Sequence, residues 1–165
     1  MMTLDARPRA VDVIVYGGLA AGALDIVNAT VFWRLYNGAA PAVILQAIAA
    51  GLLGKDAFAG GAVTAALGLF LHFFIACGMG AVYWLACLRW PSLIAKPVAA
   101  GIAYGVLTWL AMNYLIVPLS RAMPPPFIPS WFIDGVLAHV LLVGLLLAFV
   151  ARRSALRGRS LACCP

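Results

Sequence analysis

Four long apolar blocks constrain this chain more than any other feature of its sequence. They lie at about residues 11–35, 63–88, 98–117 and 131–151. Each block is long enough to cross a bilayer, which takes roughly 20 residues. Only 10% of the residues are charged, against about 25% in soluble domains. The sequence therefore predicts an all-α integral membrane protein, in which residues 1–165 form a single membrane domain built as a four-helix bundle.

A shorter apolar segment, about residues 41–54, separates the first two blocks. At about 14 residues it is too short to span, which is typical of an interfacial or re-entrant helix. Pro41 suits the first turn of such a helix, and Gly51 or Gly54 suits its end.

The basic residues predict how the spans are oriented. With four spans, both termini lie on one side of the membrane, together with eight of the 11 Lys and Arg residues. The other side holds Arg34, Lys55 and Arg121. Because cytoplasmic loops carry the excess of basic residues, both termini are predicted to be cytoplasmic.

A basic cytoplasmic tail, residues 152–165, follows the last block. Its charge suits contact with the anionic headgroups of the lipid bilayer. The basic cluster is short and next to the membrane, so we do not expect nucleic acid as a partner. Cys163 and Cys164 would lie on the reducing side of the membrane, where disulfides are rare, and we expect them in a flexible tail.

Five polar side chains lie inside the predicted spans. They are Asp25, Asn28, His72, Asn113 and His139. With a rise of about 1.5 Å per residue, all five come out in the outer half of the bilayer. Gln46 on the short helix and Asp134 near the start of the last span are candidates for the rim of this polar cluster.

His72 lies in a row of small residues, with Gly68, Ala76 and Gly80 at spacings of four. Residues four apart share one helix face, and small residues mark the faces by which membrane helices pack. We therefore expect His72 to point at a neighbouring helix. We also expect His72, His139 and Asn28 to line one interior space, with Asp25 at its border stabilising a protonated histidine.

The second half of the chain carries a series of short motifs. His72 with its aromatic neighbours is followed by Tyr83, "RWP" at Pro91, "MNYLIVPLS", "MPPPFIP", and "AHVLL" around His139 before "ARR". Their order and spacing resemble the YagU-like family of small bacterial inner-membrane proteins. The resemblance implies a four-helix protein of the bacterial inner membrane and supplies no activity. That family has an acidic residue one turn before the last-span histidine, where this chain has Gly135 beside Asp134.

Several functions are compatible with the polar cluster. Intramembrane Asp and His residues serve as relays in pumps and transporters, and we favour a proton- or small-solute-handling protein, in transport or sensing. Because four spans form a narrow bundle, a homodimer or a partner in a membrane complex is part of this hypothesis. One alternative is a haem b protein, or an accessory subunit, with His72 and His139 as axial ligands; no other cofactor is predicted.

Two further alternatives stay open. Asp25 and both histidines are a candidate ligand set for a divalent metal, and the cluster is also explained as a purely structural network of hydrogen bonds between helices. The sequence contains none of the standard hydrolase, metalloprotease or phosphate-binding motifs. It therefore favours a protein that is not an enzyme, without deciding the question.

Overall fold

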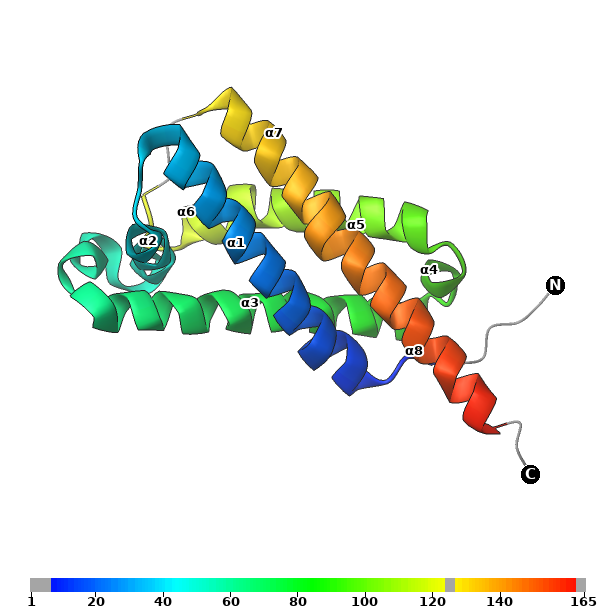
Figure 1. Cartoon of the computed structure of the whole chain (residues 1–165). Coiled ribbons are helices and arrows are strands. Elements are labelled where there is room, and N and C mark those ends of the chain that lie inside the picture. The colour runs from blue at the N-terminus through cyan, green and yellow to red at the C-terminus, as the bar shows by residue number, and fades with distance from the viewer. Residues whose placement is uncertain (1–6, 124–126, 163–165) are drawn as a thin grey trace.

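The computed structural model describes residues 7–123 and 127–162, and within those ranges every regular element is helical (Figure 1). The elements are η1 (Asp12–Gly17), α1 (Gly18–Asn37), α2 (Pro41–Leu53), η2 (Gly54–Ala59), α3 (Gly61–Arg89), α4 (Ser92–Ala95), α5 (Pro97–Ala111), η3 (Met112–Ile116), α6 (Val117–Leu119), α7 (Pro129–Ala138), η4 (His139–Leu145) and α8 (Leu146–Ala162). The predicted all-α class is confirmed.

Five segments are long and apolar enough to cross a membrane, by length and composition. They are Asp12–Asn37, Pro41–Ala59, Gly61–Arg89, Pro97–Leu119 and Pro129–Gly158. Four of them correspond to the predicted apolar blocks, and Pro41–Ala59 combines the predicted short helix with η2. Many large apolar side chains remain exposed along these segments, as expected for helices that face lipid.

Helices α1 and α3 pack antiparallel through small residues. A side chain added at Gly18 would place its Cβ 2.7 Å from the Cα of Cys77, and one at Gly22 would lie 3.0 Å from the Cβ of Ala76. Further along the same interface, Gly80 lies against Ile14 of η1. The row of small residues predicted on α3 is therefore the face that contacts α1, because only small residues allow the two backbones to approach so closely.

Helix α5 packs in the same way against the last helical run. A Cβ on Gly101 would lie 2.8 Å from the Cα of Leu145, and a Cβ on Gly105 would lie 2.5 Å from the Cα of Val140. The sequence numbers rise along one helix as they fall along the other, so these helices are also antiparallel. In Figure 1, α1 and the run from α7 to α8 cross over α3 and α5.

The short helix α2 has the expected ends. Pro41 occupies its first turn, and Gly54 follows its last residue with φ of 64°. This positive φ favours glycine, and the change of direction at Gly54 means that residues 41–59 are not one straight rod. Gly68 of α3 lies against the backbone carbonyl of Leu45 in α2, which shows that the first residue of the small row contacts α2.

Contacts between segments that are distant in the sequence bring four parts of the chain together at the end of the molecule where α2 lies. The backbone N–H of Arg121 donates to the carbonyl of Gly51 at 2.9 Å. The rings of Trp33, near the end of α1, and Trp131, in α7, lie 5.1 Å apart. The end of α1, the end of α2, the segment after α6 and the start of α7 therefore meet at this end.

The opposite end is joined by hydrogen bonds around Ser154 of α8. Its hydroxyl accepts from the backbone N–H of Arg9 at 2.9 Å and donates to Asp12 Oδ2 at 2.6 Å. The main buried cluster lies beside this network, and its largest fully buried side chains are Tyr83, Leu147, Val13 and Cys87.

Helix α8 extends further toward the end of the chain than the sequence predicted. It continues through Ala162, so residues 152–162, expected as a tail after the last span, are helical. Ala, Leu and Arg, which have high helix propensity, account for most of this stretch, and Ser154 secures it. Cys163 and Cys164 lie outside the described residues, as do the prolines at 124–126 in the predicted proline-rich loop.

Candidate functional site

The site begins at His72, in the middle of α3. Its Nε2 atom lies 2.8 Å from the backbone carbonyl oxygen of Gly22 and 4.0 Å from Oδ2 of Asp25, both in α1. A carbonyl oxygen only accepts hydrogen bonds, so Nε2 must carry the hydrogen. Nδ1 then has the free lone pair of the neutral imidazole and is the atom that a further proton would occupy.

The local sequence explains why these groups meet. Gly22 has no side chain, which allows α3 to approach close enough for His72 to reach the Gly22 carbonyl. Asp25 follows Gly22 by three residues, and residues three apart are neighbours on a helix surface. The His72 side chain is 13% exposed and that of Asp25 is 24% exposed. The pair is therefore largely shielded by protein, and its acidic member is the more accessible one.

A second polar pair joins α1 to α7. The side-chain amide of Asn28 donates to Oδ2 of Asp134 at 2.8 Å. Asn28 follows Asp25 by three residues, so α1 presents both groups along one side: Asp25 toward α3 and Asn28 toward α7. The structure thus forms a short polar line across α1 that connects three helices.

Asp134 has a larger part in this line than the rim position expected for it. The next residue, Gly135, lies against Trp109 of α5, with the indole Nε1 2.8 Å from a Cβ built on the glycine. Successive helix residues are rotated by about 100°. The contact of Gly135 with α5 therefore turns Asp134 toward α1 and Asn28, which the sequence alone did not indicate.

Asn113 and His139 are not paired with the other predicted residues in this structure. The Asn113 side chain is exposed and donates to the carbonyl of Trp109 in its own helix at 2.9 Å. Nδ1 of His139 donates to the carbonyl of Gly135, also in its own helix, at 3.0 Å. The space expected between His72, His139 and Asn28 is not seen in these contacts, which form two separate pairs, Asp25 with His72 and Asn28 with Asp134.

Gln46 stabilises the start of α3. Its amide nitrogen donates to the carbonyl of Gly61 at 3.0 Å and lies 3.4 Å from the hydroxyl of Thr64. Thr64 in turn donates to the carbonyl of Ala57 at 2.6 Å. Gln46 is thus used within the turn between α2 and α3, and its expected reach toward the polar cluster is not seen.

The two histidines differ in what they offer a metal or haem. In residues 7–123 and 127–162, no three His, Cys, Asp or Glu side chains gather closely enough to hold a metal ion. His139 keeps Nε2 available, because its bond to Gly135 uses Nδ1. His72 uses Nε2 for Gly22, so it would have to give up this bond to ligate a haem through Nε2.

The acceptor for His72 is the contact that sequence reasoning missed. In the sequence, Gly22 is one small residue of the first apolar block, but in the structure its backbone carbonyl is the closest partner of the imidazole. Backbone acceptors carry no signal in the residue type, so only the distance between α1 and α3 reveals them.

No family model, no curated protein and no solved structure matches this chain.

Proposed function

We propose that this chain is a four-span protein of the bacterial inner membrane, related to the YagU-like proteins, with both termini cytoplasmic. The spans are η1–α1, α3, α5–α6 and α7–α8, and α2 lies at the outer surface. The uneven distribution of basic residues supports this orientation. Helix α2 has 13 residues, about 20 Å at the usual rise, whereas the hydrocarbon core is about 30 Å thick.

The packing of α1 against α3 supports the same placement. If α2 crossed the membrane, the helices on either side of it would run in the same direction. The contacts of Gly18 with Cys77 and of Gly80 with Ile14 pair the start of one segment with the far part of the other. The two helices are therefore antiparallel, as they must be when the connection between them stays on one side.

The function that this arrangement supports best is the handling of protons, or of a small solute coupled to them. The observation that carries it is the Asp25–His72 pair, with Nε2 and Oδ2 4.0 Å apart and both side chains mostly shielded. Imidazole changes its charge near neutral pH. A proton taken up at Nδ1 would produce an imidazolium facing the Asp25 carboxylate, which offsets the cost of a positive charge inside the membrane.

The polar residues on α1 provide a way for protonation of His72 to affect helix packing. Asp25 and Asn28 share one side of α1, and Asn28 is hydrogen-bonded to α7 through Asp134. Protonation of His72 would strengthen its attraction to Asp25 of α1. A shift of α1 toward α3 would then change the contact between Asn28 of α1 and Asp134 of α7. This coupling fits transport or sensing, and a homodimer or a membrane-complex partner would widen the path for a solute.

A structural role is the second candidate, favoured by the Asn28–Asp134 bond between two helices. Hydrogen bonds between membrane helices contribute only about 0.6 kcal/mol on average. If the cluster is purely structural, its removal should change the free energy of unfolding slightly and should leave no proton-dependent property to lose.

Proton flux into liposomes separates the two candidates. The purified protein is reconstituted into vesicles that contain a pH-sensitive dye, and a potassium gradient with valinomycin drives protons inward. We expect flux above that of protein-free vesicles, and we expect His72→Leu to abolish it. His139→Leu is the matched control, because His139 is bonded only to its own helix. Equal flux with and without the protein, or equal loss in both variants, would contradict the proposal.

A further inference from the structure

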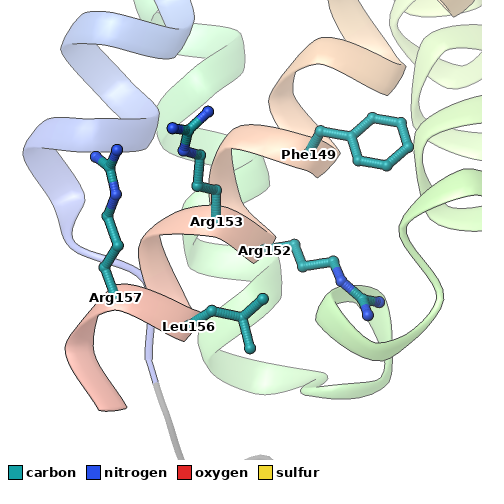
Figure 2. Close-up of a pocket in the computed structure, with 5 residues that line it drawn as sticks. All are labelled: Phe149, Arg152, Arg153, Leu156 and Arg157. Atoms are coloured by element: carbon teal, nitrogen blue, oxygen red, sulfur yellow. The ribbon is translucent and has the colours of Figure 1, made fainter. Parts of the chain in front are cut away.

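An open groove lies along α8, at the opposite end of the molecule from α2. Its lining residues are Phe149, Arg152, Arg153, Leu156 and Arg157 (Figure 2). Their spacings of three and four place them on one face of the helix. The groove is distinct from the Asp25–His72 pair, which lies between α1 and α3.

The lining carries three guanidinium groups and no carboxylate. Figure 2 shows Arg153 and Arg157 extending in the same direction from successive turns, whereas Arg152 turns away toward α4. Arg152 Nη1 donates to the carbonyl of Ala95 at 3.0 Å. The lining of the groove is therefore basic.

The groove is also lined by two exposed apolar residues, Phe149 and Leu156. Phe149 and Leu156 are 49% and 46% exposed. Phe149 lies before the arginines in the apolar segment Pro129–Gly158, so an apolar contact precedes the charged ones along the helix axis. A phospholipid in the bilayer has the same order along the membrane normal, with its acyl chains inside and its charged phosphate at the surface.

We propose that this groove binds an anionic phospholipid, with the phosphate between Arg153 and Arg157 and an acyl chain against Phe149. Planar guanidinium groups match phosphate oxygens by paired hydrogen bonds. Each guanidinium has five N–H donors, so a phosphate can be added to contacts already present. Basic pockets beside membrane helices recognise phospholipid headgroups in this way. The inference rests on the proposed membrane placement of α8 and is independent of proton handling.

Native mass spectrometry of the full-length protein in detergent tests the proposal. Phosphatidylglycerol and phosphatidylcholine with identical acyl chains are titrated separately. We expect the wild-type protein to prefer phosphatidylglycerol. We expect the double variant Arg153→Gln/Arg157→Gln to bind it about 30-fold more weakly, since each charge near an anionic headgroup contributes about fivefold. Arg89→Gln, an exposed arginine of α3 outside the groove, should bind within about twofold of wild type.

Three results would overturn the proposal. The first is equal binding of the two lipids to the wild-type protein, a measurement that needs no variant to fold. The second is a loss in Arg89→Gln as large as in the double variant, which would assign the effect to net charge. The third is displacement of phosphatidylglycerol by millimolar inorganic phosphate, which would assign the groove to a free anion. Helix content by circular dichroism confirms that the double variant is folded.

Discussion

At the scale of single residues, the two oxygen atoms that face His72 Nε2 respond differently to a proton. The Gly22 carbonyl, at 2.8 Å, accepts a hydrogen bond from neutral and charged imidazole alike. The Asp25 carboxylate, at 4.0 Å, attracts the charged form far more strongly. Gly22 therefore orients the ring, and Asp25 places a carboxylate where it would attract a charged ring.

Replacing Asp25 with Asn should reduce the proton flux into liposomes well below that of the wild-type protein. The substitution removes the carboxylate that faces the His72 imidazole, and the side chain keeps nearly the same shape. The vesicle assay with a potassium gradient and valinomycin measures the variant beside the wild type.

His139→Leu provides the reference for this measurement. The described bond of His139 is to Gly135 in its own helix, so this variant should keep the wild-type flux. Wild-type flux in Asp25→Asn would show that the carboxylate has no influence on the imidazole, and the pair would lose its assigned role.

At the scale of elements, glycine spacing on α3 determines where α2 can pack. Gly68 is buried against the Leu45 carbonyl of α2, whereas nothing lies within 4 Å of the position that a Cβ would take on Gly78. The two glycines belong to the same long helix and differ in what faces them. They therefore separate the effect of packing from the effect of helix propensity.

Gly68→Ala should destabilise the protein by about 1–3 kcal/mol, because the added methyl group forces α2 and α3 apart. Gly78→Ala should be neutral, or stabilising by up to about 1 kcal/mol, since alanine is the better helix former. Unfolding by sodium dodecyl sulfate, followed by circular dichroism, measures both variants. Equal effects of the two substitutions would mean that α2 does not depend on contact with Gly68.

At the scale of the whole molecule, the number of crossings decides where the termini lie. Four spans place both termini on one side, and a fifth crossing by residues 41–59 would place them on opposite sides. Length and composition allow residues 41–59 to cross. The antiparallel contact of α1 with α3 and the break at Gly54 favour four spans.

Reporter fusions at the two termini should both give a cytoplasmic signal. Alkaline phosphatase, active only outside the cytoplasm, and a fluorescent protein, active only inside it, are fused separately to each end. A third fusion in the loop between α6 and α7 should report the outer side and serves as the positive control for phosphatase. Opposite signals at the two termini would establish an odd number of spans.

The helical class, the approximate apolar segments, both ends of α2 and the inward face of α3 could be predicted from local sequence patterns. These properties depend on residues near one another in the chain: apolar length, a proline and a glycine at the helix ends, and small residues four apart. Which polar groups meet depends instead on how the helices pack against one another. Asn28 and Asp134 are 106 residues apart, the partner of His72 is a backbone carbonyl, and Asn113 turns outward. Such pairings follow from the rotation of each helix about its axis, which is set by close contacts with neighbouring helices, as Gly135 against Trp109 sets Asp134.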